Sequence, residues 1–380
     1  MKVKTDFEVI IVGGGLAGLI SSILLGRAGI KVLLVEKKSY PFHKVCGEYV
    51  SNEVLPFLLS LGFDPFTYGA SRITDLRIST SSGKNYFSKL DLGGFGLSRF
   101  KMDNVLFEIA KGAGVEAFTN NRVTEIDYEE NIFTVHLGDQ STYTARIVIG
   151  SYGKRDTLDK KLDRPFIEDR TNFLAVKYHV NTNYPIHEIG LDNFQNGYCG
   201  IVKIEDDEFN LCYLFRRNGY DFRSIKELEE EILFKNPVLE TLIKNSNFKN
   251  EPLVINQISF ARKALIENHI LMCGDAAGLI APLCGNGMSM AIHAGKILCE
   301  LIIRSGILSG EITTVKRSQL EQQYQHNWNK LFSQRLLIGR LLQRLMLQSS
   351  VSKFAVPALH SVPVVKDWFI SKTHGKTVNV

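Results

Sequence analysis

The chain has 380 residues, of which 44% are hydrophobic and 22% charged, and its net charge is +5 at neutral pH. At roughly 150 residues per domain this length predicts two or three domains, and the composition excludes wholesale disorder. The charge is too small and too dispersed to indicate a nucleic-acid partner. Six scattered cysteines without a C-x-x-C pair predict reduced thiols, a cytoplasmic protein and no metal site.

The first 40 residues predict a strand–helix–strand unit that binds a dinucleotide. An apolar run at 8–12 precedes the glycine-rich segment 13–18, a helical pattern follows, and a second strand at 31–35 ends in an acidic residue. This spacing places a pyrophosphate at the helix N-terminus and ribose hydroxyls on the carboxylate. We therefore expect cofactor contacts from Gly13, Gly15, Ala17, Gly18, Glu36 and Lys37.

The middle of the chain lacks further strand–helix–strand units. A hairpin is predicted at 73–89, two strands at 132–149, and more strands at 173–180 and 198–215. This pattern predicts an antiparallel sheet inserted into the nucleotide-binding domain. Because the chain contains a single dinucleotide-binding fingerprint, the glycine-rich segment 13–18, a nicotinamide donor such as NAD(P)H would dock only transiently.

A second glycine cluster follows a predicted buried strand at 270–273. Asp275 stands where ligands bind in open α/β sheets, and its carboxylate suits the hydroxyls of a ribityl chain. A helix that opens at Gly287 would direct its positive N-terminus at a flavin. The alternative is that Asp275 is only the N-cap of a short helix. The cofactor contacts expected here are Gly274, Asp275, Pro282, Gly285, Gly287 and Met288.

Four segments together carry a resemblance to a known family: 13–18 with Glu36, Lys44-Val45-Cys46-Gly47-Glu48, the helix from Arg99 to Leu106, and the second glycine cluster. The chain resembles FAD-dependent oxidoreductases of the aromatic-hydroxylase (group A flavin monooxygenase) fold, and within it the geranylgeranyl reductase-like branch. The resemblance implies FAD and an α/β fold. A discontinuous Rossmann-type FAD-binding domain would carry an inserted antiparallel β-sheet substrate domain and a C-terminal helical segment.

The resemblance also implies roles for single residues. Arg99 would approach the FAD phosphates or ribityl chain, Val123 would contact adenine through its backbone, and Cys46 and Gly47 would lie beside the isoalloxazine ring. Two positions depart from the family. Tyr152 stands where an Asp is common, which leaves direct reduction by a nicotinamide open. Gly200 stands where isoprenoid reductases carry a Trp, which leaves the isoprenoid substrate open.

The expected domains divide the chain as follows: FAD-binding at 1–72, 93–165 and 256–328, substrate sheet at 73–92 and 166–255, and C-terminal helical segment at 329–380. In the last segment, leucines from Leu331 to Leu345 alternate with Lys330, Arg335, Arg340 and Arg344. Such a helix either packs on its own domain or rests peripherally on an anionic membrane. The sequence indicates no oligomeric state.

The first choice of function is reduction of an unsaturated small molecule, isoprenoid-like or of polyene or polyketide type, by flavin hydride. Cys46 and His43 are the candidate proton donors, with simple packing as the alternative for both. Tyr198, Cys199 and Tyr213 are expected on the substrate side. One alternative is hydroxylation through a flavin C4a-hydroperoxide, with halogenation disfavoured because the halogenase Trp-x-Trp-x-Ile-Pro motif is absent. Another is a membrane-associated electron-transfer flavoprotein.

Overall fold

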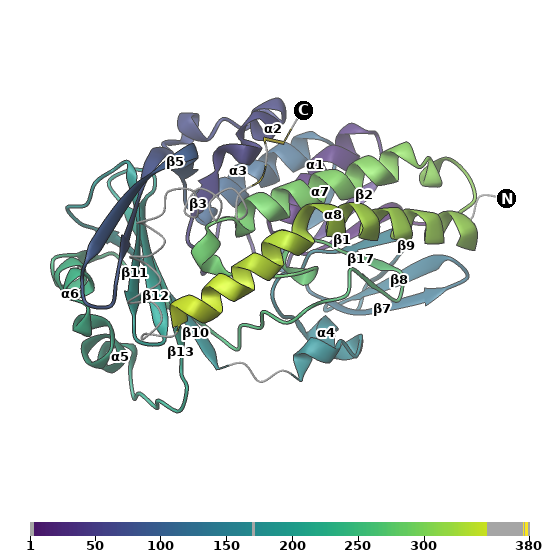
Figure 1. The fold of residues 1–380 in the computed structure, drawn as a ribbon. Coiled ribbons are helices and arrows are strands. Elements are labelled where there is room, and N and C mark those ends of the chain that lie inside the picture. The colour runs from purple at the N-terminus through teal and green to yellow at the C-terminus, as the bar shows by residue number, and fades with distance from the viewer. Residues whose placement is uncertain (1–3, 169–171, 348–374, 376, 379–380) are drawn as a thin grey trace.

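The computed structural model describes residues 4–168, 172–347, 375 and 377–378, and two β-sheets organise them (Figure 1). In the first sheet, β1 is parallel to both of its neighbours, β2 and β9. Strand β1 is almost entirely buried, which explains its continuous apolar run. In spatial order the strands of this sheet are β16 (Ile266–Glu267), β17 (Ile270–Met272), β9 (Thr142–Gly150), β1 (Phe7–Val12), β2 (Val32–Val35) and β6 (Glu116–Phe118), with the hairpin of β7 (Val123–Glu129) and β8 (Ile132–Leu137) attached to β9.

Helices pack around this first sheet and against one another. Helix α1 contacts both α3 and α7, and α8 packs on α7. The approach of α1 to α7 is close, because a Cβ on Gly295 would lie 3.0 Å from the carbonyl oxygen of Ala17. The helices are α1 (Leu16–Arg27), α2 (Leu55–Ser60), α3 (Arg99–Gly112), α4 (Thr157–Lys161), α7 (Gly287–Arg304) and α8 (Thr314–Leu347).

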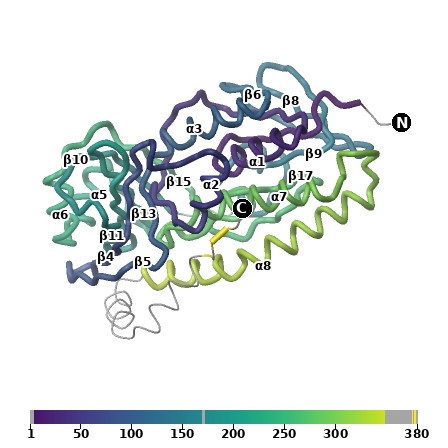
Figure 2. The backbone as a smooth tube through the Cα atoms, turned by 90° about the horizontal axis from the view of Figure 1, so that it is seen from above, coloured from purple at the N-terminus to yellow at the C-terminus, as the bar shows by residue number. Residues whose placement is uncertain are grey.

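The second sheet is antiparallel except where β11 runs parallel to β4. Helices α5 (Ile225–Glu231) and α6 (Pro237–Lys244) pack on one of its faces, which we call the outer face. Seen from above, this sheet lies at one end of an elongated molecule, and α8 runs along one side (Figure 2). In spatial order the strands are β14 (Asn247–Phe248), β10 (Phe173–Asn181), β13 (Phe209–Arg216), β12 (Gly197–Lys203), β11 (Glu188–Phe194), β4 (Ser71–Ser79), β5 (Asn85–Gly96) and β3 (Tyr49–Ser51), and β15 (Leu253–Asn256) also pairs with β10.

This architecture confirms the predicted fold class, although two details differ from the expectation. Strand β5 continues to Gly96, beyond the expected end at 92, and it pairs with β3 at Tyr49–Ser51. The second sheet therefore includes residues that were expected in the FAD-binding domain. Three glycines in the last four residues of β5 have low strand propensity and hid this continuation. Helix α8 begins at Thr314 and passes the expected 328/329 boundary without a break. The division of the chain into domains stays a prediction.

Candidate active site

The predicted fingerprint forms a tight turn between β1 and α1. Gly13 has a φ of +100°, and a Cβ on Gly18 would lie 2.0 Å from the Gly13 carbonyl oxygen, so neither position accommodates a side chain. The N–H of Gly14 donates to a carboxylate oxygen of Glu36 at 2.7 Å. Helix α1 has no acidic residue in its first turn and no side-chain cap. Its first N–H groups are therefore available to an anionic ligand.

Two cations reach this helix N-terminus from other segments. Arg99 Nη2 and Lys44 Nζ lie 3.9 and 4.0 Å from the point where a Gly15 Cβ would stand. Both side chains bind Asp103, at 2.6 and 2.9 Å. Burial opposes ionisation of Asp103, but Arg99 and Lys44 outweigh it and lower the pKa of that carboxyl group. Free N–H groups beside a guanidinium and an ammonium suit a diphosphate, so this part of the site fits the predicted FAD.

The second glycine cluster touches the first. Gly274 has a φ of +64°, and a Cβ added to it would lie 2.9 Å from the Cβ of Ala17. Two cations hold this loop: the half-buried Lys263 donates to the Asp275 carbonyl at 2.9 Å, and the buried Arg164 donates to the Ala276 carbonyl at 3.0 Å. Burial lowers the pKa of Lys263 to about 8. The structure therefore brings the two remote loops together, as a single bound cofactor requires.

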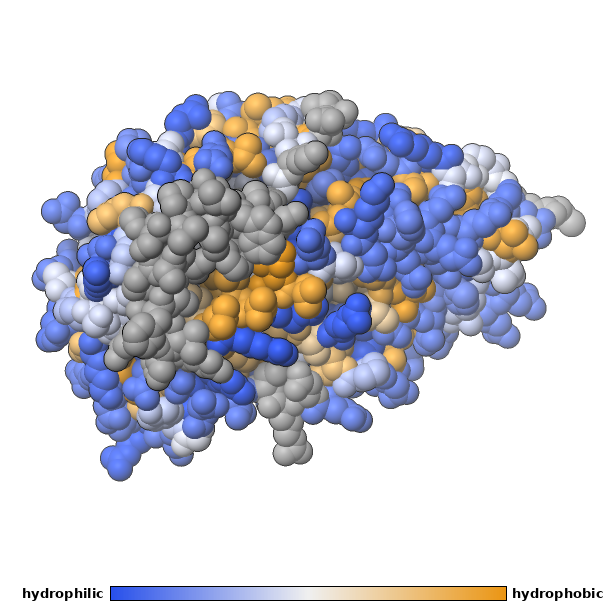
Figure 3. Space-filling model, viewed as in Figure 1, coloured by the Kyte–Doolittle hydropathy of each residue, from blue (hydrophilic) through white to orange (hydrophobic). Residues whose placement is uncertain are grey.

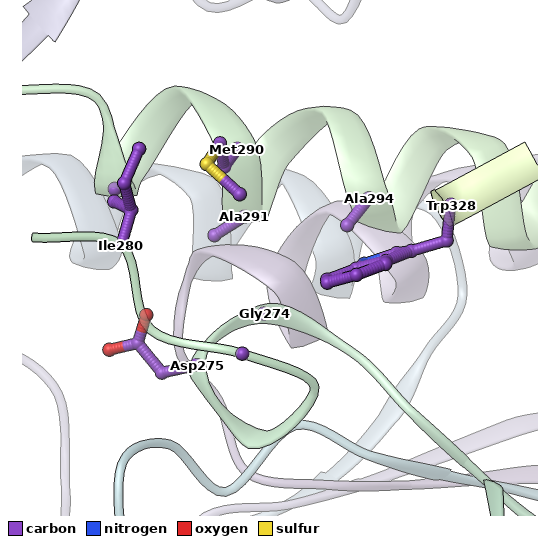
Figure 4. A pocket seen from close by; sticks show the side chains of 9 residues that line it. Gly274, Asp275, Ile280, Met290, Ala291, Ala294 and Trp328 are labelled. Atoms are coloured by element: carbon purple, nitrogen blue, oxygen red, sulfur yellow. The ribbon is translucent and has the colours of Figure 1, made fainter. Parts of the chain in front are cut away.

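A pocket opens beside the Asp275 side chain. In Figure 4, Asp275 and Ile280 lie at one end of it and Trp328 at the other, with Met290 and Ala291 of α7 along its length. It encloses about 250 Å³ including its mouth. The ribityl contact expected for Asp275 stays a prediction.

The other expected cofactor residues lie around these two loops. Val123 is buried at the start of β7, and Asn121, two residues before it, donates its N–H to the Glu36 carbonyl at 3.2 Å. Lys37 instead forms an ion pair with Asp156 at 2.7 Å. The remaining ones precede or open α7 and are Pro282, Gly285, Gly287 and Met288.

The loop that carries Cys46 borders open space. Cys46 is half-buried, and its thiol interacts with the guanidinium of Arg99. Gly47 is exposed, and no atom lies within 4 Å of the place where its Cβ would be. Lys154 approaches the Val45 carbonyl at 3.5 Å. A planar ring next to Cys46 and Gly47 is therefore compatible with the packing.

His43 lies away from this opening. Its ring stacks on Phe100, with a centroid distance of 4.6 Å, and meets the edge of His179 at 5.2 Å. Burial, followed by the charges of Lys177 and His179, lowers the pKa of His43. His43 therefore belongs to a charged cluster behind the Cys46 loop.

One face of the second sheet, which we call the inner face, turns toward the cofactor loops. Tyr198 packs there in an apolar cluster with Leu214 and Leu279, and its hydroxyl oxygen accepts the N–H of Leu283 at 3.1 Å. Two half-buried positions that pair across β12 and β13, Gly200 and Cys212, lie on the same face. Tyr198 therefore lies on the inner face, and its predicted contact with a substrate stays a prediction.

The structure corrects the same expectation for Cys199 and Tyr213. Both lie on the outer face, in the hydrophobic core that α5 and α6 close. Cys199 is fully buried, and the Tyr213 hydroxyl donates to Glu229 at 2.8 Å. The reason is the alternation of side chains along a strand, which turns Cys199 away once Tyr198 points inward.

Sequence reasoning missed the charged groups behind the Cys46 loop. Lys177 and His179 are buried on β10, and both bind Glu48. The sequence did contain a sign of this cluster: two ionisable residues stand two positions apart in an otherwise apolar strand, and residues at that spacing share one face of a sheet. Cys212 was missed because nothing in its own strand distinguishes the inner face from the outer one.

Two glycine-rich turns that meet beyond the ends of parallel strands, with cations at a free helix N-terminus, define a dinucleotide-binding site. The family described as FAD binding domain matches residues 6–306. The chain belongs to this family and is an FAD-dependent oxidoreductase, as the sequence predicted.

Curated relatives carry reductase names. A digeranylgeranylglycerophospholipid reductase of Methanococcus vannielii is 24% identical over 353 residues, covering 90% of this chain and 88% of that protein. A menaquinone reductase of Mycobacterium tuberculosis is 21% identical over 325 residues, covering 80% and 78%. The predicted resemblance to the geranylgeranyl reductase-like branch is thereby confirmed.

Solved structures share the fold. A geranylgeranyl bacteriochlorophyll reductase-like protein of Thermoplasma acidophilum superposes with a TM-score of 0.76 at 18% identity, covering 96% of both chains. A flavin-dependent brominase also gives 0.76, at 17% identity, covering 97% of this chain and 94% of the other. One fold therefore occurs in a reductase-like protein and in a brominase, and the reaction has to be argued from the site.

Proposed function

We propose that this protein reduces a carbon–carbon double bond in the isoprenoid chain of a lipid. The observation that carries this proposal is the apolar cluster between the inner face and the segments before α7. It lies next to the Cys46 loop and consists of Ala175, Tyr198, Leu214, Ile258 and Leu279, with Val45, Phe173, Leu191, Ile255, Phe260 and Leu283 around them. Such a surface binds a hydrocarbon chain and excludes water.

Gly200 adds room on this surface. A Cβ at Gly200 would have no neighbour closer than 3.8 Å, and the nearest atoms are backbone oxygens of β13 and β11. A branched prenyl chain is thick enough to use this space, which a large side chain would fill. The relatives named as reductases of prenyl lipids and of menaquinone support the same substrate class.

Within this proposal the chemistry divides between cofactor and protein. Reduced FAD supplies the hydride. The protein binds the isoprenoid chain against the inner face, excludes water with the apolar cluster, and provides the proton through the thiol of Cys46, which borders the opening. Arg99 lies against that thiol and orients it.

The test uses the full-length protein loaded with FAD and reduced chemically without oxygen. Mixed with a geranylgeranyl lipid, it should yield a product heavier by two hydrogen atoms per saturated bond in mass spectrometry. Cys46→Ala should slow this reaction, whereas Cys299→Ala, a fully buried thiol on α7, serves as the matched control. No mass change in the lipid contradicts the proposal.

A monooxygenase is the second candidate, because the brominase shares the fold. The same lipid, incubated with the reduced protein in air, distinguishes the two. Incorporation of one oxygen atom identifies oxygen chemistry, and the reductase proposal then fails. Reduction of an added quinone without a change in the lipid would instead identify electron transfer.

We further propose that α8 rests on a membrane surface, from which a lipid substrate is reached. Among the described residues no helix is both long and apolar enough to span a bilayer. Phe332 and Leu336 are buried, but Leu337 is 63% and Leu341 52% exposed. Figure 3 shows this hydrophobic surface over the C-terminal part of α8.

The charges on and near α8 also support its contact with a membrane surface. Burial lowers the pKa of Arg340, and the nearby charges of Arg262 and Arg344 lower it further. From Gln322 to Leu347 the helix contains no acidic residue. Exposed leucines among arginines fit an anionic lipid surface.

Vesicle sedimentation tests this contact with the full chain. The protein should bind vesicles that contain anionic lipid, and binding should fall in the double variant Leu337→Ser and Leu341→Ser. The matched control is Val315→Ser, an exposed residue in the first turn of the same helix. Equal binding by all three proteins, or none by the wild type, contradicts the membrane contact.

A further inference from the structure

A buried carboxylate lies directly behind the Cys46 loop. Glu48 is 0% exposed and has a φ of +54°, a conformation that costs a non-glycine residue free energy unless its surroundings fix it. Its carboxylate is fixed from three directions. It accepts the N–H of Arg99 at 2.8 Å and binds Lys177 at 2.5 Å and His179 at 2.7 Å.

Both cationic partners of Glu48 stand on the inner face of the second sheet. Lys177 also donates to the carbonyl of Lys44 at 3.2 Å, so it binds the Cys46 loop at both of its ends, Lys44 and Glu48. It pairs across the sheet with Cys212. Burial raises the pKa of the Cys212 thiol to about 12, and Cys46 and Lys177 both act on it electrostatically. The cluster therefore lies beside Cys212, which in turn interacts electrostatically with Cys46.

The other end of the cluster reaches the protein surface. His179 Nδ1 lies 3.5 Å from Glu208, whose side chain is 30% exposed. Asn210, opposite His179 in β13, is 1% exposed, and its side-chain amide has no hydrogen-bond partner among the described residues. Burying such an amide costs free energy, so a polar molecule that pairs with it would be held beside His179.

From this geometry we infer that Glu208, His179, Glu48 and Lys177 form a relay that carries protons from solvent to the thiols of Cys46 and Cys212. The inference rests on the proposed function, because saturation of a double bond consumes one proton for each hydride. The inference adds a source for that proton. In it Glu48 and Lys177 are positioning and relay residues, and they do not touch the substrate.

A purely structural role explains the cluster less well. Buried ion pairs stabilise proteins little, because desolvation offsets their attraction. Burial opposes ionisation of Glu48, but Lys177 and His179 outweigh it and lower the pKa of its carboxyl group. Glu48 therefore stays ionised beside His179. Histidine is the side chain that exchanges protons near neutral pH.

The relay balances in atoms and charge. One substrate carbon receives the hydride, and the other forms a C–H bond as the S–H bond of Cys46 breaks. The thiolate takes a proton from the ammonium group of Lys177. The amine regains that proton through the carboxylate of Glu48 from the imidazolium of His179, and solvent at Glu208 reprotonates the imidazole.

Charged groups from several elements surround His179. They come from the Cys46 loop, β10 and the turns after β12 and β14, and are Glu48, Lys177, His43, Glu208 and Lys249, which pairs with Glu208 at 3.9 Å.

The first experiment needs no substrate. Nuclear magnetic resonance of the FAD-loaded protein with labelled histidines, assigned by comparison with His179→Gln, should show the ring N–H of His179 exchanging with solvent through Glu208. In Glu208→Gln this exchange should slow at least tenfold. A His179 ring N–H that does not exchange with solvent in the wild type, or that exchanges equally fast in Glu208→Gln, overturns the relay.

The second experiment measures the rate of lipid reduction against pH in single turnovers. The wild-type rate should fall as the pH rises from about 5 to 8, because the relay takes its protons from solvent, whereas His179→Gln should be at least tenfold slower and independent of pH in this range. His136→Gln is the matched control, because His136 forms a 2.8 Å pair with Asp127 on the exposed β7–β8 hairpin.

Retention of the wild-type rate and pH profile by His179→Gln, with FAD bound normally in its visible spectrum, overturns the relay. If the wild type does not reduce the lipid but the ring N–H of His179 exchanges with solvent and Glu208→Gln slows that exchange, the substrate proposal fails and the relay stands. Failure of either inference is thus visible separately.

Discussion

The two faces of the second sheet use the same strands for different purposes. On the outer face, side chains such as Leu211 and Phe215 pack against α5 and α6 in a closed hydrophobic core. The ionisable Glu229 there is satisfied by the hydroxyl groups of Tyr178 and Tyr213, each at 2.8 Å. Burial raises the pKa of the Glu229 carboxyl group.

The inner face is mixed instead of closed. Apolar residues such as Leu214 alternate there with the half-buried Cys212 and the buried Lys177 and His179. Successive residues of one strand therefore serve stability and chemistry in turn. The comparison teaches that a shift of one position along β12 or β13 moves a residue from the core to the site.

The largest expected effect comes from replacing a leucine on each face of the sheet by alanine and comparing the two variants. Leu211→Ala, on the outer face, should lower the free energy of unfolding by about 2–5 kcal/mol, because it leaves a cavity in a closed core. The affinity for FAD should change little. Urea unfolding and FAD titration measure the two quantities.

Leu214→Ala is the matched variant on the inner face of the same strand. It should destabilise less than Leu211→Ala, because the surface around it is open to substrate, but it should weaken lipid binding more. Equal losses of stability, with no difference in lipid reduction, would show that the two faces are not distinct in function.

The cofactor loops could be predicted because their geometry is local. The fingerprint at 13–18 fixes a turn, a helix N-terminus and a close helix approach within a few residues, and the loop of Asp275 follows its strand directly. Their meeting followed from a general rule, since ligands in open α/β sheets bind beyond the strand ends. The structure places Gly274 against Ala17 accordingly.

The inner face could not be predicted in the same way. Strands β12 and β13 are mostly buried on both sides. The alternation of side chains along each strand therefore divides its residues between two faces, but it does not show which face lies toward the cofactor. Cys199 and Tyr213 were therefore misplaced. The Glu48 cluster joins residues about 130 positions apart, and no local pattern in the sequence connects them.

An intermediate effect concerns charge near the cofactor loops. Burial lowers the pKa of Lys263 to about 8 from its ordinary 10.5. Between these two values the unfolded chain binds more protons than the folded one, so stability rises with pH across this window. In FAD-free protein the rise should be at most about 3 kcal/mol, at 1.36 kcal/mol per pKa unit.

Lys263→Met removes this contribution, so the difference in unfolding free energy between wild type and variant should change only between about pH 8 and 10.5. Denaturant unfolding at a series of pH values measures it. A difference that stays constant across this range would mean that Lys263 remains charged throughout, and that the Asp275 loop is held by an ammonium group.

The smallest expected effect tests whether Tyr198 links the inner face to the cofactor site. Its hydroxyl oxygen accepts the N–H of Leu283, which precedes α7 by four residues. Tyr198→Phe leaves that buried N–H without its partner and should lower stability by about 1 kcal/mol. Because the same segment leads into the helix that faces the cofactor, FAD affinity should fall a few-fold as well. Tyr213→Phe removes one of two hydroxyl donors to Glu229 on the outer face, so it should cost similar stability and leave FAD affinity unchanged. If both variants weaken FAD alike, the coupling runs through the whole sheet and the contrast between its faces is lost.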